Sequence, residues 1–368
     1  MTLTRRKTLA LIGGGVVLAA AAAGGGFFST RTPVRALAPW QMAGRYADAR
    51  LRALSWALLA PNPHNRQPWV AELAGADQVI IHRDRTRNLP ATDPFDRQLT
   101  IGMGCFLELM TMAAAEEGLA VTLTLFPEGE DGPVAQARFA DGGAPDPLFA
   151  HALQRRSCKE PYAERPVPDA AAAALSAHAR ILRDPELVAA LRALTWAAFE
   201  VEYRTPATLQ ESIDLMRFGR AEIEANPDGI ELGGPFLEAL MLAGVINRAA
   251  QADPDSMAFK TGLDIYSRML AATPAYAVIA TAGNSREDQI EAGRQWLRLN
   301  LAATQLGLAV QPVSQALQEF PEMAEHYAAA HALLARDGET LQMLGRLGYG
   351  PATGPSPRWP LETRLIDA

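Results

Sequence analysis

Cysteine is scarce in this chain of 368 residues. Cys105 and Cys158 are its two cysteines, so a disulfide framework is excluded, although a single bond between them remains open. Charged residues make up 20% of the sequence, the net charge is -7, and there is no long basic run, so nucleic-acid binding has little support. The six histidines are scattered; His326 and His331 do not share a helix face. We therefore predict no metal site.

The beginning of the chain differs in composition from the rest. A twin arginine, Arg5 and Arg6, precedes an apolar run over residues 9–28, and an A-x-A cleavage pattern follows at residues 36–38. This predicts an export signal over residues 1–38 and a periplasmic protein, or a membrane-anchored one if the signal is not cleaved. A dinucleotide-binding loop at residues 12–15 is less favoured, because no strand precedes it. Export of folded proteins by this route favours a tightly held cofactor, here an organic one.

Hydrophobic periodicity and glycine or proline breaks divide the remainder into helices and short strands. A region rich in Gly, Asp and Pro at residues 128–147 is predicted to be a linker. The apolar stretch at residues 235–245 is expected to be a buried core helix, with a lid over a ligand as the less favoured alternative. The expected helices are residues 44–59, 99–117, 185–203, 207–217, 236–245 and 289–306, and the expected strands are residues 79–81, 121–125 and 275–281.

The two parts of the chain on either side of this linker resemble each other. Each has a short strand, a polar loop and a long helix. The letters GLAV follow this helix, beginning at Gly118 in the first part and at Gly307 in the second. We therefore predict an internal duplication, with halves at residues 39–147 and 148–368. Such halves would pack around a pseudo-two-fold axis and imitate a symmetric dimer within one chain. The chain is accordingly expected to be a monomer.

Three short stretches carry residue types that suit ligand binding. The sequence PNPHNRQPW at residues 61–69 loads a proline-stiffened loop with amides, which both donate and accept hydrogen bonds. The sequence RRSCK at residues 155–159 offers three cations and a hydroxyl, a set that suits a phosphate, although a solvated surface cluster is about equally expected. Near the C-terminus, Arg358 lies between prolines in SPRWP and has little backbone freedom.

Together these stretches resemble the FMN-dependent nitroreductase family, in particular its Acg-like single-chain branch. The resemblance extends from about residue 44 to the end of the chain. It depends on an R-x-S-x-K motif, a P-x-x-x-N-x-Q-P-W loop, a helix ending in L-G-L followed by a strand and Pro312, and the C-terminal arginine. It implies an α+β, nitroreductase-like fold with two pseudo-repeats that mimic the family homodimer, and one complete FMN site between them.

The resemblance also implies which residues would hold FMN. The R-x-S-x-K segment and the C-terminal arginine would hold the phosphate, and the amide-bearing loop would reach the flavin ring. Trp69 is expected to pack under that loop. The chain departs from the family pattern at Ser314, where an acidic residue is common, and at Ser356, where a lysine is common. The implied cofactor-binding residues are Pro61, Asn62, Pro63, Asn65, Gln67, Arg155, Arg156, Ser157, Lys159, Pro312, Val313, Ser314 and Arg358.

Two functions follow from this resemblance. The first is an FMN-dependent oxidoreductase that passes electrons to a small oxidised acceptor such as a nitroaromatic or a quinone. The flavin carries that chemistry, so no catalytic side chain is assigned. The donor is left open between NAD(P)H, a quinol and a protein, because an exported protein would not meet nicotinamides. The second function is a flavin-binding protein without turnover, which stores or sequesters FMN. Loss of flavin binding altogether is a third interpretation.

Overall fold

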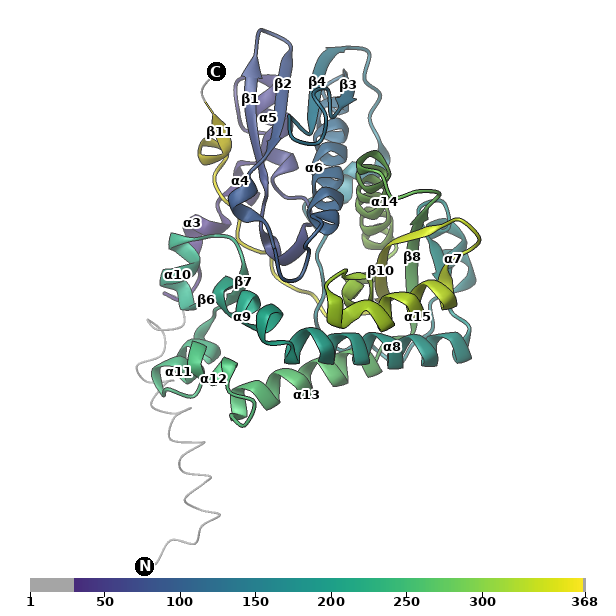
Figure 1. Ribbon diagram of the computed structural model, residues 1–368. Coiled ribbons are helices and arrows are strands. Elements are labelled where there is room, and N and C mark those ends of the chain that lie inside the picture. Colours follow the sequence, from purple (N-terminus) through teal and green to yellow (C-terminus); the bar gives the residue numbers. More distant parts are fainter. Residues whose placement is uncertain (1–29, 367–368) are drawn as a thin grey trace, which may run out of the picture.

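The computed structural model describes residues 30–366, and the twin-arginine pattern and most of the apolar run lie outside these residues. The fold is α+β, as the resemblance implies, with two mainly antiparallel sheets that flank a central pair of long helices (Figure 1). One sheet has the strand order β11-β1-β2-β4-β3, and the other has the order β5-β8-β10-β9. A third sheet consists of two short parallel strands, β6 and β7.

The first half follows the order helix, hairpin, long helix, hairpin. Asp48 caps the first helix by accepting a hydrogen bond from Arg50 N. The half contains α5 (Ala49–Ala57), β1 (Trp69–Ala74), β2 (Gln78–Arg83), α6 (Arg97–Ala115), β3 (Leu119–Leu125) and β4 (Ala135–Asp141). The predicted linker at residues 128–147 is wrong, because it contains β4, which pairs with both β2 and β3. Strand β1 was not predicted, because its residues directly follow the proline-rich loop.

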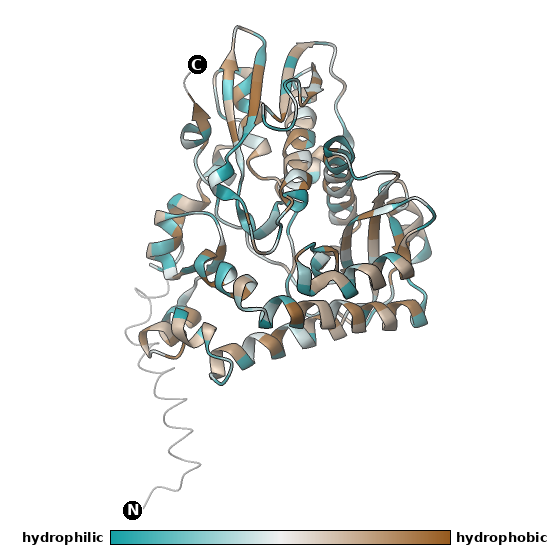
Figure 2. Cartoon of the chain, viewed as in Figure 1, coloured by the Kyte–Doolittle hydropathy of each residue, from teal (hydrophilic) through white to brown (hydrophobic). Residues whose placement is uncertain are grey.

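The second half repeats this order. It contains α7 (Asp169–Leu175), β5 (Arg180–Leu182), β8 (Ala275–Thr281), α14 (Arg286–Gln305), β9 (Ala309–Pro312) and β10 (Thr340–Gly348). In both sheets the four strands of the repeat occupy the same spatial order, and neighbouring strands of each repeat are antiparallel. The central strands β8 and β10 of the second sheet are largely buried, and the residues of β8 are mostly apolar (Figure 2). The predicted internal duplication is therefore present in the topology.

The two long helices, α6 and α14, cross at a pair of glycines. A Cβ atom on Gly104 would lie 2.1 Å from the carbonyl oxygen of Ile290, and one on Gly293 would lie 2.0 Å from that of Ile101. Each glycine stands fourteen residues before the left-handed glycine that ends its own helix, Gly118 or Gly307. The crossing is thus made by equivalent residues of the two repeats, as at an isologous dimer interface.

Reciprocal ion pairs extend this pseudo-symmetry. Arg97 at the start of α6 pairs with Glu319 of the second half at 3.0 Å, and Arg286 at the start of α14 pairs with Glu130 of the first half at 2.8 Å. The arginines occupy equivalent positions before the crossing glycines, and the glutamates occupy equivalent positions after the helix-ending glycines. The halves are not separate folding units, because one hydrophobic core includes residues of both α6 and α14.

A largely helical insert at residues 183–274 is the main difference between the repeats. It lies between β5 and β8, whereas a tight turn joins the equivalent strands β1 and β2. In Figure 1 it forms the base of the molecule. The insert contains α8 (Pro185–Arg204), α9 (Pro206–Leu215), β6 (Met216–Phe218), α10 (Gly219–Ala225), β7 (Ile230–Leu232), α11 (Pro235–Leu242), α12 (Arg248–Ala252) and α13 (Met257–Ala271).

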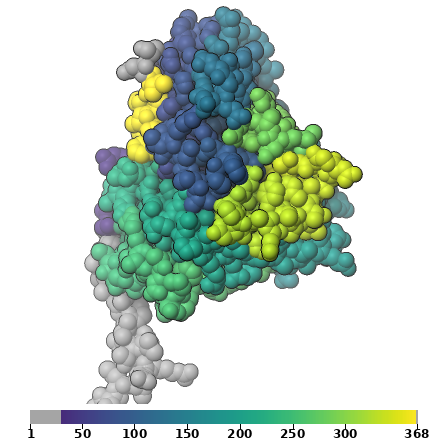
Figure 3. All heavy atoms as spheres, in the orientation of Figure 1, coloured from purple at the N-terminus to yellow at the C-terminus, as the bar shows by residue number. Residues whose placement is uncertain are grey.

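The chain ends cross the boundary between the halves. After α15 (Ala324–Leu334) and β10, the C-terminal arm (residues 349–366) runs to the first sheet, where β11 (Leu365–Ile366) pairs in parallel with β1. Figure 3 shows this arm in yellow beside the blue first half. Near the other end, α3 (Val34–Leu37) and α4 (Pro39–Met42) pack on the fold, and Ala36 is 2% exposed. The predicted boundary at residue 38 therefore falls within packed structure.

Candidate functional site

The loop at residues 61–67, called here the amide loop, has a strained backbone. His64, Asn65 and Gln67 have φ angles of 46°, 52° and 50°. Such left-handed angles are uncommon for residues other than glycine and cost free energy at each position. Pro63 begins a short 3-10 turn inside the loop and fixes its entry. Strain of this kind persists only where the surroundings hold the backbone in place. The contacts of the loop therefore show what keeps it in this conformation.

The loop is first closed on itself. The backbone nitrogen of Gln67 donates to Asn62 Oδ1 at 2.7 Å, and Asn62 Nδ2 donates to the carbonyl of Ala60 at 3.2 Å. Both polar atoms of the Asn62 side chain therefore serve the turn. Trp69, which follows the loop, is fully buried and stacks on Phe106 with ring centroids 4.8 Å apart. Trp69 is therefore a core residue, and its place beneath the loop stays a prediction.

The C-terminal arm holds the loop from one side. Asn65 Nδ2 donates to the carbonyl of Pro357 at 3.1 Å, and Arg358 Nη1 donates to Asn65 Oδ1 at 2.6 Å. The backbone nitrogen of Trp359 donates to Gln67 Oε1 at 2.9 Å. Residues almost 300 positions apart in the sequence are thus joined by side-chain amides. The two motifs that the sequence analysis singled out separately form one structure.

The insert holds the loop from the other side. Gln67 Nε2 donates to the carbonyl of Pro227 at 2.7 Å, and the backbone nitrogen of Gly229 donates to the carbonyl of Asn65 at 3.2 Å. Arg66 forms an ion pair with Asp228 at 3.1 Å. The sequence predicts that the loop amides face a ligand, whereas their polar side-chain atoms are bonded within the chain. The amides build the loop, and their contact with a ligand remains a prediction.

The R-x-S-x-K segment lies against the edge of the second sheet. Ser157 forms a parallel bridge with Val310 of β9, and the backbone nitrogen of Cys158 donates to the carbonyl of Val310 at 3.2 Å. This pairing fixes the segment in an extended form. Arg155 is 4% exposed, Ser157 is half-buried and Lys159 is exposed. Cys158 and Cys105 are both buried and free, so the open question of a disulfide is answered.

Two buried arginines converge on the end of α5. Arg155 Nη2 donates to the carbonyl of Leu59 at 3.0 Å. Arg358 Nε donates to the carbonyl of Leu58 at 2.7 Å, and its Nη2 donates to that of Ala60 at 3.2 Å. The carbonyl groups at a helix C-terminus carry partial negative charge, which favours guanidinium groups there. The sequence predicted phosphate ligands, and the structure shows that these arginines also hold the start of the amide loop.

Arg155, Arg156, Lys159 and Arg358, together called the cation cluster, lack carboxylate partners. Within residues 30–366, none of the four forms an ion pair with a carboxylate. A buried guanidinium usually has a charged partner, because its desolvation is costly. Burial, together with the charge of Arg155, lowers the pKa of Arg358 to about 9. Burial, together with the charge of Arg156, lowers the pKa of Arg155 to about 10. The cluster is therefore a positive site without an ion-paired carboxylate among the described residues.

Glu231 and His64 lie within reach of the charges of this cluster. Burial raises the pKa of Glu231, while Lys159 and Arg358 oppose that rise. Burial, with the charges of Lys159 and Arg66, lowers the pKa of His64 to about 4, so this imidazole is neutral at physiological pH. The amide loop therefore contributes a neutral ring near Lys159, and β7 of the insert contributes a carboxylate, Glu231, whose charge acts on Lys159 and Arg358.

Trp40 is part of this site, and sequence reasoning missed it. The guanidinium carbon of Arg156 lies 4.4 Å from the ring centroid, and that of Arg358 lies 5.7 Å from it. Trp40 Nε1 donates to the carbonyl of Ser356 at 2.8 Å. Arg358 Nη1 donates to Ser356 Oγ at 2.8 Å, so the serine that replaces a family lysine positions the arginine. A lone tryptophan beside an expected cleavage site gave no signal of this role.

The end of β9 (Pro312) and the two residues after it, Val313 and Ser314, follow Val310, the bridge partner of Ser157. Pro312 is exposed, while Val313 is 2% exposed and its backbone nitrogen donates to the carbonyl of Leu344 at 2.9 Å. Ser314 Oγ donates to the same carbonyl at 3.1 Å. In the part of the chain that the structure describes, no hydrogen bond joins these residues to the amide loop. Their role as ligand contacts stays a prediction.

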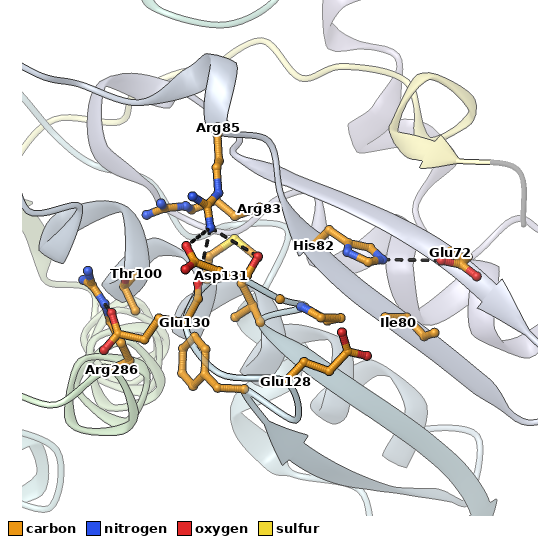
Figure 4. A pocket seen from close by; sticks show the side chains of 15 residues that line it. Glu72, Ile80, His82, Arg83, Arg85, Thr100, Glu128, Glu130, Asp131 and Arg286 are labelled. Atoms are coloured by element: carbon orange, nitrogen blue, oxygen red, sulfur yellow. Dashed lines mark hydrogen bonds and ion pairs between the residues drawn. The ribbon is translucent and has the colours of Figure 1, made fainter.

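A separate groove of about 420 Å³ lies over the first sheet (Figure 4). Several of its charged groups are paired within the groove: Arg85 with Asp131 at 2.8 Å and Arg286 with Glu130 at 2.8 Å. His82 lies 3.4 Å from Glu72. The arginines of the groove thus have carboxylate partners, in contrast to those of the cation cluster. No group of three or more potential metal ligands is found among residues 30–366.

The fold is thus a duplicated α+β structure, in which a cluster of cations without ion-pair partners among residues 30–366 lies beside the amide loop. No protein-family model matches the chain. The chain is 25% identical over 342 residues to the Mycobacterium tuberculosis protein named "Putative NAD(P)H nitroreductase Rv3131", covering 87% of this chain and 92% of that protein. It is 31% identical over 125 residues to "Putative NAD(P)H nitroreductase acg" of the same species, covering 32% and 37%. The similarity to the first of these relatives extends along nearly the full length of both chains.

Among solved structures, the chain is similar to the FMN-dependent nitroreductase NfnB of Mycobacterium smegmatis in complex with NADPH. The identity is 19%, the TM-score is 0.37, and 59% of this chain and 96% of that chain are covered. A nitroreductase of Anabaena variabilis is 11% identical with a TM-score of 0.39, covering 80% and 82%. TM-scores this low carry no argument about function. An assignment of function therefore depends on the topology, the site and the relatives that match along nearly their full length.

Proposed function

We propose that this protein binds FMN between its two halves and is a flavin-dependent oxidoreductase of the nitroreductase type. The observation that carries the proposal is the cation cluster, in which two arginines are almost completely buried without a carboxylate partner among the described residues. A terminal phosphate is the group on FMN that such a site fits. The names of the full-length relatives support the same assignment.

Each part of the site has a task in this proposal. Arg155, Arg358 and Lys159 bind the phosphate, and the Trp40 ring packs on the guanidinium groups of Arg156 and Arg358. The amide loop, held by the C-terminal arm and the insert, provides a rigid wall that orients the ring system. When bound, FMN supplies the redox chemistry, taking electrons from a donor and passing them to a small oxidised acceptor such as a nitroaromatic or a quinone.

An absorption spectrum followed by an FMN titration tests binding. We expect flavin bands in the purified protein, or after addition of FMN to protein freed of it. Lys159→Gln removes a cation that has no ion-pair partner in the described chain, so FMN affinity should fall by about tenfold or more, at roughly 1.5–3 kcal/mol per charged hydrogen bond. Lys260→Gln is the matched control, because Lys260 is exposed and pairs with Asp255 in the insert. Equal affinities for the two variants contradict the proposed phosphate site.

Turnover needs a second measurement. The loaded protein is mixed with NADH, NADPH or a quinol, and bleaching of the flavin absorption is followed before and after addition of an acceptor. Bleaching by one donor and recovery with an acceptor is the expected result. We propose that the donor belongs to one of these classes or is a reduced protein, and that the chain works as a monomer after export by the twin-arginine route.

One observation favours a second function, retention of FMN without turnover. The insert is attached directly to the amide loop through Asp228, Pro227 and Gly229. An insert fixed there restricts access to the site from that side. Flavin absorption that persists with every donor, in protein that binds FMN tightly, would identify this storage function.

A further inference from the structure

Helix α11 of the insert buries its charged residue and exposes large apolar ones, which is the reverse of an ordinary amphipathic helix. Its sequence, PFLEALML, contains one charged residue, and that residue, Glu238, is the only buried one. Phe236 is 74% exposed and Leu242 is 79% exposed. Apolar helices normally turn their apolar side inward. The sequence-based expectation of a buried core helix is therefore wrong.

The exposed apolar residues of α11 continue onto its neighbours. Val245, after α11, is 42% exposed, and Met257, at the start of α13, is 75% exposed. Figures 1 and 3 show α11, α12 and the start of α13 together at the lower edge of the molecule. We call Phe236, Leu242, Val245 and Met257 the apolar patch. A cluster of large exposed apolar side chains on a water-soluble surface indicates a partner.

The N-terminal chain leaves the described structure beside this patch. Arg31 forms an ion pair with Glu238 of α11 at 3.1 Å, and Arg220 Nη1 donates to the carbonyl of Thr30 at 2.7 Å. The apolar run at residues 9–28 ends just before Thr30, and its length of twenty residues equals that of a membrane-spanning helix. The described chain therefore begins beside the apolar patch, directly after the apolar run in the sequence.

Removal of the N-terminal run at the A-x-A pattern conflicts with the packing. Ala36 is 2% exposed, its carbonyl accepts a hydrogen bond from Arg358 N at 2.8 Å, and its backbone nitrogen donates to Glu224 at 3.2 Å. Cleavage after residue 38 would remove this segment from the wall of the cation cluster. An intact N-terminus keeps the wall complete and keeps the apolar run attached.

The border of the patch carries cations. The side chains of Arg31, Arg220 and Arg248 are 33%, 40% and 47% exposed, respectively. Each forms an ion pair with a glutamate and keeps part of its guanidinium surface open to solvent. Guanidinium groups around an apolar surface match the anionic headgroups and acyl chains of a bilayer. We propose that the apolar patch lies on the lipid bilayer, next to an uncleaved N-terminal apolar run that anchors the chain.

The test uses the full-length protein and cysteine probes. Phe236→Cys and, as a control, Phe95→Cys are labelled with an environment-sensitive fluorophore; Phe95 is 60% exposed and precedes α6 in the first half. The native cysteines are 1% and 2% exposed, so they should not react. Each labelled protein is mixed with vesicles of phosphatidylcholine and phosphatidylglycerol. We expect a blue shift and quenching by nitroxides attached to the acyl chains at position 236, and neither at position 95.

Other outcomes overturn the proposal. Vesicle-bound protein whose label at position 236 stays accessible to aqueous iodide shows that the patch faces water. A label at position 236 that is already in an apolar environment before lipid is added shows that the N-terminal run or a second copy covers the patch, and dilution separates these two. Protein that does not bind the vesicles also contradicts the proposal. None of these outcomes depends on FMN, so the proposed function is tested separately.

Discussion

At the scale of single residues, one buried carboxylate that contacts several arginines holds the site together. Asp228 accepts contacts from three arginines, with Arg87 at 2.6 Å, Arg217 at 2.9 Å and Arg66 at 3.1 Å, and it is 6% exposed. A carboxylate that compensates several guanidinium groups stabilises the fold, because these groups would otherwise be desolvated without a partner. It also joins the insert to the amide loop.

Asp228→Asn should therefore lower the free energy of unfolding by about 3–5 kcal/mol, the cost of leaving buried charges without their partner. Denaturant-induced unfolding followed by circular dichroism measures this change. Asp131→Asn is the control, because Asp131 is 97% exposed and pairs only with Arg85 on the surface; its effect should stay within about 0.5 kcal/mol. Similar losses for both variants would show that Asp228 is not the centre of the network.

Glu202 on α8 gives a pH-dependent prediction. Burial raises its pKa to about 7, and its Oε2 atom has no hydrogen-bond partner among the described residues. Because the folded-state pKa lies above the unfolded value of 4.5, ionisation opposes folding. This penalty is absent below pH 4.5, grows as the pH rises, and is complete above pH 7.

Glu202→Gln should remove this penalty. Relative to the parent, the variant should gain about 3 kcal/mol of unfolding free energy between pH 4.5 and pH 8. Urea unfolding at several pH values measures the difference, with Glu200→Gln on the same helix as the control, because Glu200 is half-exposed and pairs with Arg204. A difference that does not change with pH would mean that Glu202 ionises normally.

At the scale of elements, the crossing of α6 and α14 is a very close contact between the two repeats. Both helices place a glycine there, and each faces a backbone carbonyl of the other helix. A side chain of any size at either position must push the helices apart. Since these helices support both sheets and share the main core, their separation would disturb the whole fold.

Gly104→Ala should lower the free energy of unfolding by about 3 kcal/mol or more, because overpacking here meets backbone and not a flexible side chain. Gly354→Ala serves as the control, since an added methyl group there would have no atom within 4 Å and the φ angle of Gly354 is not left-handed. Thermal unfolding of both variants measures the contrast. A Gly104→Ala protein as stable as the parent would show that the helices separate at little cost.

At the scale of the whole molecule, the two repeats have diverged around one pseudo-two-fold axis. The loop between α5 and β1 carries the amide motif, whereas the equivalent connection between α7 and β5 has only four residues, Ser176 to Ala179. The second half has instead gained the insert. One side of the pseudo-dimer therefore has a complete loop, and the other does not, which agrees with a single site.

The reciprocal ion pairs offer a direct measure of this divergence. Arg97 is 1% exposed and its partner Glu319 is 18% exposed, whereas Arg286 and Glu130 are 21% and 67% exposed. Glu319→Gln should thus destabilise the protein by about 3 kcal/mol or more. Glu130→Gln, its equivalent in the other repeat, should cost about 1 kcal/mol or less. Denaturant unfolding compares them, and equal losses would contradict the assigned difference in burial.

Much of this fold followed from local patterns in the sequence. The predicted helix at residues 185–203 and the strand at residues 275–281 agree with α8 and β8, because their hydrophobic periodicity and proline or glycine boundaries are local properties. The letters GLAV after a long helix, which occur in both halves, revealed the duplication. In contrast, β4 was mistaken for a linker, since its alternating residues are flanked by Gly, Asp and Pro and its pairing partners lie far along the chain.

The sequence by itself determined the residue types of the site: an amide-rich loop, three cations in RRSCK, and an arginine between prolines. Only the tertiary structure decided what these groups bond to. The amides of the loop bond to the C-terminal arm and to the insert. The Trp40 ring packs on the guanidinium group of Arg156, and α11 turns apolar side chains outward. The physical reason is that hydrogen-bond partners and burial depend on segments distant in the sequence, which no local pattern specifies.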